Sequence, residues 1–124
     1  MIKVSPKAAR TDPATGIVFA SKGELARWHE LLLLARAGEI TELRRQVKFP
    51  LLVNGKPILI RSEGYPNGRE CVYRADFAYR ENGQEVVEEF KPRFNEASRL
   101  RIAVAEACCG ITVKITGGGR LRTS

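Results

Sequence analysis

The sequence has very few of the residue types on which several common enzyme mechanisms depend. His29 is the only histidine among the 124 residues, which argues against histidine-dependent nuclease mechanisms and against a Cys/His catalytic pair. The three cysteines cannot all pair in disulfides, and the adjacent Cys108 and Cys109 lack the spacing of metal ligands. We therefore expect free thiols, and we expect any catalysis to use other side chains.

Long apolar runs and acidic residues are also scarce. No apolar run approaches the roughly 20 residues that a membrane span needs, and the segment after Met1 lacks the hydrophobic stretch of a secretion signal. These absences predict an intracellular protein that does not bind a membrane. The 14 Asp and Glu residues face 21 Lys and Arg, which gives a formal net charge of +7. Such an excess suits a nucleic-acid partner, although a solvated basic surface explains it equally well.

Length and composition fit one domain with its own core, since 44% of the residues are hydrophobic. We expect this domain at residues 17–116. A loosely packed basic arm (1–16) precedes it, and a flexible basic tail (117–124) follows it. The three glycines 117–119 are not a phosphate-binding loop, because no strand-to-helix context or GK[ST] element accompanies them.

Capping signals predict two helices. Ser21 and Glu24 have the spacing of a capping box, and the helix that they begin should end near Ala37, before Gly38. Asn95 should cap a second helix over 96–109, which ends at Gly110. Its buried stripe is expected to consist of small and aliphatic residues: Ala97, Leu100, Ala103, Val104 and Ala107.

Alternating apolar residues predict the strands. One strand should contain Val47, Phe49, Leu51 and Val53, with Pro50 marking an edge position or a bulge. After a turn at Asn54-Gly55, a returning strand should carry Ile58 and Ile60. Residues 62–70 should form a loop, and residues 111–116 a last strand. With the hairpin described next, the order is α-β-β-β-β-α-β, which predicts an α/β fold with a mixed sheet and a helix on either face.

The central feature is a hairpin around Asn82-Gly83, the strongest short-range signal for a two-residue turn. That turn pairs residues whose numbers sum to 165, so Asp76 faces Glu89, and Lys91 projects from the same face. Two opposed carboxylates repel each other unless a cation lies between them. The pattern therefore indicates a divalent-metal site. A plain salt-bridge cluster, in which Lys91 neutralises both carboxylates, is the alternative.

Asp76 followed by Glu89-Phe90-Lys91 resembles the Asp…(Asp/Glu)-X-Lys signature of the restriction-endonuclease-like superfamily, PD-(D/E)XK. The wider pattern resembles a phage-borne family of small nucleases related to Holliday-junction resolvases. Two positions depart from that pattern, since Phe90 and Pro92 stand where an aliphatic residue and a glycine are expected. The similar stretches are Gly16–Phe19, Ser21–Ala26, Ala37–Ile40, Gln46–Phe49, Tyr73–Phe77 and Val86–Lys91.

The resemblance implies a restriction-endonuclease-like core and a metal-dependent endodeoxyribonuclease. Asp76, Glu89 and the backbone carbonyl of Phe90 would hold Mg²⁺ or Mn²⁺. Lys91 would orient or deprotonate the attacking water or offset phosphoryl charge. Glu24 would complete the site directly or through water, although a glutamate at this position also serves simply to cap its own helix.

The expected partner is DNA, and the expected contacts are basic or amide side chains: Gln46, Arg93, Arg99, Arg120 and Arg122. A plain surface amide explains Gln46 about equally well, and an ordinary solvated arginine is the default explanation for Arg93 and for Arg99. The resemblance points to branched DNA in the recombination or repair of a phage or prophage, and hence to the host cytoplasm. Resolving a junction takes two active sites and therefore a homodimer. The rival interpretation is a DNA-binding module that retains the nuclease fold without catalysis.

Overall fold

The computed structural model describes residues 10–91 and 93–118. In chain order the elements are β1 (Arg10–Thr11), β2 (Val18–Phe19), α1 (Lys22–Arg36), β3 (Thr41–Pro50), β4 (Leu52–Val53), β5 (Lys56–Pro57), β6 (Leu59–Ser62), β7 (Tyr65–Glu70), β8 (Val72–Glu81), β9 (Gln84–Phe90), α2 (Glu96–Cys109) and β10 (Val113–Thr116). The main sheet has the order β10-β9-β8-β3, with β10 parallel to β9 and the other neighbours antiparallel. The predicted mixed sheet with two helices is confirmed.

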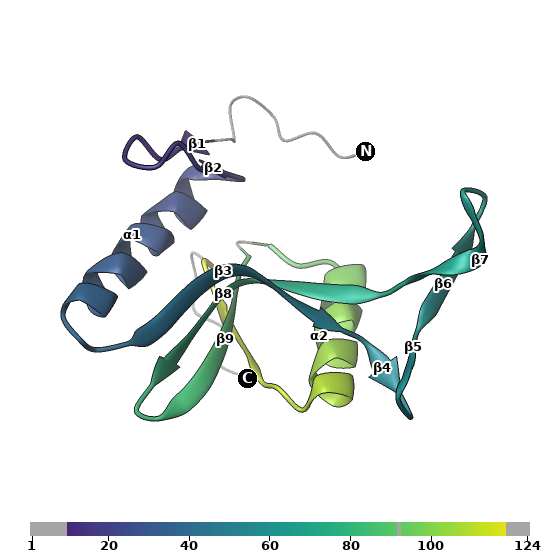
Figure 1. Cartoon of the computed structure of the whole chain (residues 1–124). Helices are drawn as coiled ribbons and strands as arrows, with labels where there is room; N and C mark the ends of the chain where they lie inside the picture. Colours follow the sequence, from purple (N-terminus) through teal and green to yellow (C-terminus); the bar gives the residue numbers. More distant parts are fainter. Residues whose placement is uncertain (1–9, 92, 119–124) are drawn as a thin grey trace.

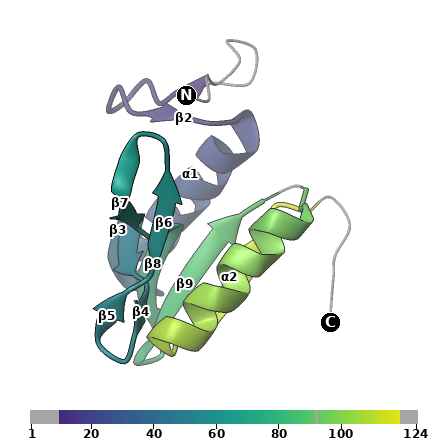
Figure 2. The same cartoon turned by 90° about the vertical axis from the view of Figure 1, so that its right-hand side faces the viewer.

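The two helices cover opposite faces of this sheet. Successive residues of a strand point to opposite sides, so neighbours on one strand pack against different helices. Val86 of β9 packs in the core that contains Trp28 and Leu31 of α1, whereas its neighbour Val87 packs with Ile102 of α2. Figures 1 and 2 show α1 and α2 on the two sides of β8 and β9. Neither described helix has the length and apolar composition that crossing a membrane would require.

Both helices begin and end where their capping residues predict. The Ser21 side chain accepts a hydrogen bond from the Glu24 amide at 3.1 Å, and the Asn95 side chain accepts one from the Ser98 amide at 2.8 Å. Gly110 ends α2 with φ 67°, a left-handed conformation that glycine adopts without strain.

The buried stripe predicted for α2 is wrong for Ala97, Leu100, Ala103 and Ala107, which are exposed, whereas Val104 packs half-buried against the core. Leu100 is 61% exposed, and the helix instead buries Ser98, Ile102 and Ala105 against the sheet. These residues also recur at helical spacing, so periodicity alone could not choose between two adjacent faces. The consequence is a row of apolar side chains on the outer side of α2 that no described residue covers completely.

Residues 51–71, which we call the arm, extend from the main sheet between β3 and β8, away from α1 in Figure 1. Asn54-Gly55 turns between β4 and β5 as predicted. The loop expected over 62–70 is wrong, because Tyr65–Glu70 is strand β7 and pairs with β6. Its glycine and proline residues favour turns locally, but pairing with β6 overrides that preference. Glycine is required at position 68, since a Cβ added there would lie only 2.9 Å from the Leu59 Cβ. Ile60 lies on strand β6, as predicted, and is 43% exposed.

The part of the N-terminal arm that the structure describes is packed more tightly than we expected. Arg10–Thr11 pairs with Val18–Phe19 to form a small hairpin against α1. Asp12 lies in its loop, is 1% exposed, and accepts hydrogen bonds from the Ala14 amide and the Thr15 hydroxyl. His29 of α1 lies 3.3 Å from the same carboxylate, so the single histidine joins this hairpin to the helix.

Candidate active site at the fork of the sheet

The hairpin has the predicted register, and the candidate site lies where its two strands part. Asn82 and Gly83 turn with φ 53° and 76°, and five pairs follow, from Glu81–Gln84 to Phe77–Glu88. Beyond that pair β8 continues alongside β3, while β9 continues alongside β10. We call this place the fork. Asp76 and Glu89 are the first residues past the last pair, one on each branch.

The backbone is irregular at the fork, and this sets the position of Asp76. Gln46, which would pair with Asp76, has φ 54°, and the ladder between β3 and β8 has no pair at this position. Tyr73 and Ala75 pack on the α2 side, whereas Phe77 packs on the α1 side. In a regular strand these three would share one face. Asp76 therefore stands where the buried side of β8 changes from one core to the other.

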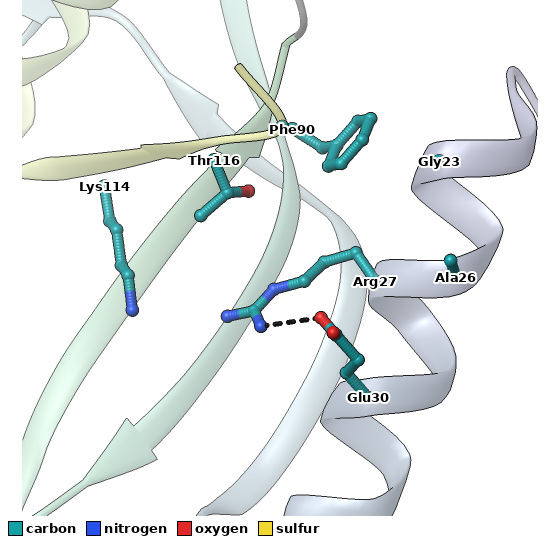
Figure 3. A pocket seen from close by; sticks show the side chains of 8 residues that line it. Gly23, Ala26, Arg27, Glu30, Phe90, Lys114 and Thr116 are labelled. Carbon is teal, nitrogen blue, oxygen red and sulfur yellow. Dashed lines mark hydrogen bonds and ion pairs between the residues drawn. The ribbon is translucent and has the colours of Figure 1, made fainter. Parts of the chain in front are cut away.

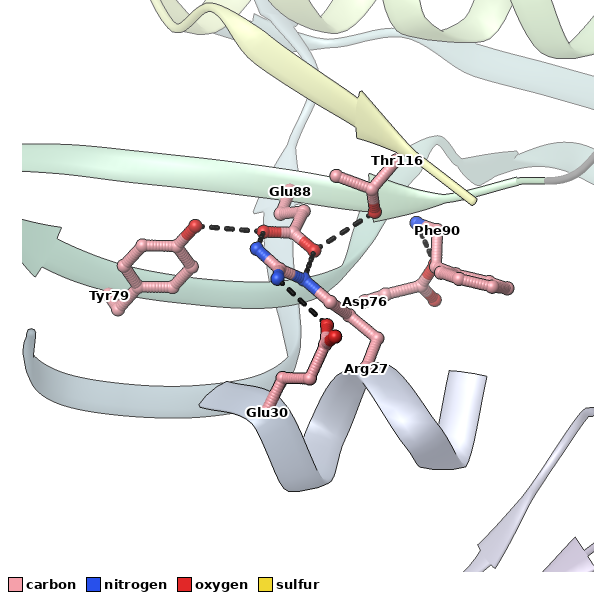
Figure 4. A network of polar contacts seen from close by, with 7 residues as sticks. All are labelled: Arg27, Glu30, Asp76, Tyr79, Glu88, Phe90 and Thr116. Carbon is pink, nitrogen blue, oxygen red and sulfur yellow. Dashed lines mark hydrogen bonds and ion pairs between the residues drawn. The ribbon is translucent and has the colours of Figure 1, made fainter. Parts of the chain in front are cut away.

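The carboxylate of Asp76 bridges the two branches of the fork. Its Oδ2 accepts a hydrogen bond of 2.8 Å from the Phe90 amide, which no longer pairs with β8 (Figure 4). Burial, together with the charges of Glu89 and Glu24, raises the pKa of Asp76 to about 7 against the lowering effects of the Phe90 amide and Lys91. All four predicted catalytic side chains, Glu24, Asp76, Glu89 and Lys91, thus lie close enough to interact electrostatically.

Glu24 enters the site from the first turn of α1. Its amide makes the capping bond to Ser21, but its carboxylate has no hydrogen-bond partner among residues 10–91 and 93–118. The residue is only 7% exposed. Burial and the negative charge of Glu89 raise the pKa of Glu24, and Arg45 opposes them. The carboxylate is therefore turned toward the fork and does not close a capping box on the Ser21 amide.

Glu89 is held by a residue that our sequence analysis did not assign to the site. Tyr73 donates its hydroxyl hydrogen to Glu89 Oε1 at 2.6 Å. Burial and this bond to a carboxylate raise the pKa of Tyr73 well above its usual range, so the phenol stays a donor. The available signal was that Tyr73 belongs to the family-like stretch ending at Phe77. Tyr73 leaves Glu89 Oε2 without a protein donor among the described residues.

Arg45 of β3 is the second residue that the sequence analysis missed. Its guanidinium carbon lies 4.4 Å from the centre of the Phe19 ring, and its Nε is buried without a partner among the described residues. Its charge lowers the pKa of Glu24. Its neighbour Arg44 instead pairs with Glu85 on the exposed part of β9, and no motif in the sequence singles out one of the two arginines.

The Phe90 side chain joins the start of α1 to the end of the sheet. A Cβ added to Gly23 would lie 2.7 Å from Phe90 Cζ, and one added to Gly117 would lie 2.7 Å from Cε1. Figure 3 shows the ring pointing from β9 toward Gly23, at the rim of a hollow also lined by Arg27 and Lys114. Two glycines thus accommodate an aromatic ring where the family-like pattern predicts an aliphatic residue, and the contact positions the turn that carries Glu24.

Glu88, one residue before Glu89, belongs to a different network. Arg27 Nε and Nη2 donate to its two oxygens at 2.7 and 2.9 Å, and the hydroxyls of Tyr79 and Thr116 donate at 2.8 and 3.0 Å (Figure 4). Burial by itself would raise the pKa of Glu88, but these donors outweigh burial and lower it. Glu88 is 0% exposed and fully paired, so its role is to attach α1 to the sheet.

The predicted DNA contacts lie in several places. Gln46 is half-buried on β3 beside the fork, and Arg93 and Arg99 are exposed at the start of α2, with Arg99 5.8 Å from the centre of the Phe94 ring. Arg120 and Arg122 lie outside the described residues. None of the three described side chains has an acidic partner among the residues described.

The donors at the fork are hard oxygen atoms, which suit Mg²⁺ or Mn²⁺. Asp76 and Glu89 each keep one carboxylate oxygen with no hydrogen bond from the described protein. Within residues 10–91 and 93–118, no group of three or more histidine, cysteine, aspartate or glutamate side chains has the arrangement of a complete metal centre. Two carboxylates are nevertheless sufficient for Mg²⁺, which retains several of its own waters and takes further ligands from substrate phosphates.

Comparisons with known proteins place the chain in a family. Residues 7–107 match the sequence profile described as "Protein of unknown function (DUF1064)", a span that includes α1, the arm, the fork and most of α2. No curated protein and no solved structure matches the chain. Because the profile covers well over half of its length, the chain belongs to the DUF1064 family.

Proposed function

We propose that this protein is a metal-dependent endodeoxyribonuclease. The observation that carries the proposal is the gathering of Glu24, Asp76, Glu89 and Lys91 at the fork, from α1 and from the ends of two strands. Three carboxylates in a partly buried place, with Lys91 and Arg45 as the cations that act on them, still leave net negative charge, which costs free energy unless a further cation balances it. Glu88, by contrast, is neutralised by Arg27.

The order of elements supports the same proposal. Without the arm and the first hairpin, the chain runs α1-β3-β8-β9-α2-β10, with a helix on each face of the four-stranded sheet. This is the core that the resemblance to restriction-endonuclease-like nucleases implies. At the fork, where the two branches of the sheet part, Asp76, Glu89 and Lys91 are each half-buried and not fully enclosed.

In the proposed mechanism Asp76, Glu89 and the Phe90 carbonyl would hold Mg²⁺ or Mn²⁺, which when bound would lower the pKa of a water and stabilise charge on the phosphate. The Phe90 amide holds Asp76, and Tyr73 holds Glu89, so both carboxylates are oriented before substrate arrives. Lys91 orients or deprotonates the attacking water or offsets phosphoryl charge, and Glu24 accepts a hydrogen bond from water at the site.

DNA is the proposed partner because of the charge balance and the position of the cations. The chain carries a net charge of +7. Arg93 and Arg99 follow Lys91 closely in the chain, and Gln46 lies on β3 at the position that would pair with Asp76. Such groups contact phosphates and position the duplex. An enzyme of this kind acts in the cytoplasm of the cell that holds the DNA. If its substrates are the four-way junctions of phage or prophage recombination, it acts as a homodimer.

The test is a cleavage panel over plain duplex, nicked duplex, flap and four-way-junction DNA with Mg²⁺ or Mn²⁺. We expect metal-dependent cuts in at least one substrate, lost with EDTA and lost in Asp76→Asn. Glu85→Gln is the matched control, since Glu85 lies on the exposed part of β9 and pairs with Arg44. DNA binding without cleavage under any metal would favour the non-catalytic DNA-binding module.

A further inference from the structure

A groove between the arm and α2 reaches the fork. It has a volume of about 580 Å³, and Glu89 is among the residues that line it. Its walls come from β6, β7 and β8 on one side and from α2 on the other. The arm that forms the first wall was expected to be partly loop, so the sequence did not indicate this groove.

Three arginines from three different elements line the groove. Arg69 lies on β7, Arg74 on β8 and Arg101 on α2, and all three are exposed. None of them has an acidic partner within residues 10–91 and 93–118, although Arg69 also lies 5.6 Å from the centre of the Tyr65 ring. Unpaired guanidinium groups along a concave surface attract a polyanion.

The same groove carries exposed aliphatic side chains. Leu100 is 61% exposed, Ile60 43% and Val72 42%, and all three belong to its lining. Leu100 lies on the apolar row of α2 that the sequence predicts for the core and that the structure turns outward. The groove therefore offers both positive charge and apolar contact area.

We propose that this groove binds an unpaired strand of nucleic acid and leads it to the fork. The proposal rests on the nuclease function proposed above and narrows its substrate to DNA with a single-stranded segment. A duplex keeps its base faces stacked inside and presents mainly phosphates and groove edges, so Leu100 and Ile60 would gain little from it. An unpaired strand exposes base faces to apolar side chains while arginines bind its phosphates.

A second copy of the chain fits the groove less well. A two-fold contact across it would bring Arg69, Arg74 and Arg101 of both copies together, and the chain already has a net charge of +7. Like charges placed opposite each other disfavour association. Glu89 is the only acidic residue among those that line the groove, and it belongs to the site itself.

The test measures binding in EDTA, so that it does not depend on cleavage. Fluorescence anisotropy with a fluorescein-labelled 20-nucleotide single strand of mixed sequence is compared with the same strand in a duplex. We expect Leu100→Ser to weaken single-strand binding about fivefold and duplex binding less than twofold, because aliphatic contacts to bases are weaker than aromatic stacking. The matched control is Leu33→Ser on α1, where Leu33 is 62% exposed, and both affinities should stay at the wild-type value.

A second pair of variants tests the charges. Arg101→Ala should flatten the slope of log K against log salt for the single strand by about 0.7, whereas Arg36→Ala, an exposed arginine at the end of α1, should not change it. The proposal is overturned if Leu100→Ser weakens both ligands equally or neither. It is also overturned if sedimentation velocity shows a wild-type dimer that Leu100→Ser dissociates, since the groove then binds a second copy.

These outcomes separate the groove from the nuclease function. Selective single-strand binding by a protein that cuts no DNA would remove the proposed enzyme and keep the groove. Metal-dependent cleavage by a protein whose Leu100→Ser variant binds single strands normally would keep the enzyme and remove the groove.

Discussion

Glu88 and Glu89 are neighbours on β9, yet their carboxylates differ in burial, in hydrogen-bond partners and in the charge of the groups around them. Glu88 points toward α1, is 0% exposed, and receives hydrogen bonds from Arg27, Tyr79 and Thr116. Glu89 points to the other side and receives one hydrogen bond, from Tyr73, beside two further carboxylates. A carboxylate whose partners neutralise it holds elements together, whereas one that adds to unbalanced negative charge can bind a cation.

The largest effect should come from Glu89→Gln. Glutamine keeps the size of the side chain but removes the charge that a divalent cation needs, so we expect cleavage to fall by about 10³-fold or more. The melting temperature should not fall, because removing one of several like charges relieves repulsion at the fork. Activity of the variant near the wild-type level would remove Glu89 from the metal site.

Glu88→Gln should show the opposite pattern. It leaves Arg27, whose side chain is 18% exposed, next to a neutral partner, so we expect a loss of about 3 kcal/mol in the free energy of unfolding. Cleavage should survive at temperatures where the variant is folded. Chemical denaturation measures the loss, with Glu85→Gln as an exposed control that should change stability by less than about 1 kcal/mol. A stable Glu88→Gln variant without activity would reverse the roles of the two glutamates.

Glu24→Gln separates the two roles that a glutamate has at the start of a helix. The Ser21 cap uses the amide of residue 24 and not its carboxylate, so α1 should keep its stability. We expect cleavage to fall about 100-fold, the size of a lost acid–base or water-orienting group. Thermal melts run beside the cleavage assay provide the control. A fully active variant would return Glu24 to a capping role.

Gly23→Ala tests whether Phe90 positions the turn that carries Glu24. Alanine is the better helix former by up to about 1 kcal/mol, but its Cβ would lie 2.7 Å from Phe90 Cζ and should cost about 1 to 3 kcal/mol in strain. We expect lower cleavage and no gain in stability. In a Phe90→Leu background the same change should become neutral or stabilising, and a double-mutant cycle measures that coupling. Additive effects would show that the ring does not hold the turn.

Asp76 and Glu88 also differ in the pH dependence of stability that we expect in EDTA. The pKa of Asp76 is raised to about 7 in the folded protein, so the folded state binds a proton that the unfolded state releases near pH 4. The stability from this group is complete below about pH 4 and is lost as the pH rises toward 7. Chemical denaturation of wild type and Asp76→Asn from pH 4 to 8 gives the difference between their free energies of unfolding at each pH. The pKa of Glu88 is lowered, so its contribution is lost in the opposite direction, as the pH falls. If this difference in free energy does not change with pH, Asp76 is ionised in the folded protein over the whole range and its pKa is not raised.

Much of the local structure follows from short stretches of sequence. Asn82-Gly83 specifies a turn whose two residues both have positive φ, and the turn then sets the register of every hairpin pair. Ser21 and Asn95 begin helices because their side chains accept a hydrogen bond from an amide of the first turn. These signals act over four residues or fewer, so no distant contact is needed to read them.

Other features depended on contacts that no local pattern contains. Tyr65–Glu70 has turn-forming residues and yet forms a strand, because β6 offers it a partner. The face of α2 that is buried was misassigned, since Ile102 and Leu100 are equally apolar and only the sheet selects between them. No local pattern identifies Arg27 as the partner of Glu88 or Tyr73 as the partner of Glu89.

The sequence by itself determined the hairpin register, the bounds of both helices, and the alternation that turns Glu88 and Glu89 to opposite faces. Those properties come from backbone conformations and hydrogen bonds between near neighbours. Only the tertiary structure decided where β8 and β9 part, that Glu24 and Arg45 lie near Asp76, and that the apolar row of α2 faces a groove. Burial and charge act through space, and residues that are distant in the chain, such as Glu24 and Asp76, determine them together.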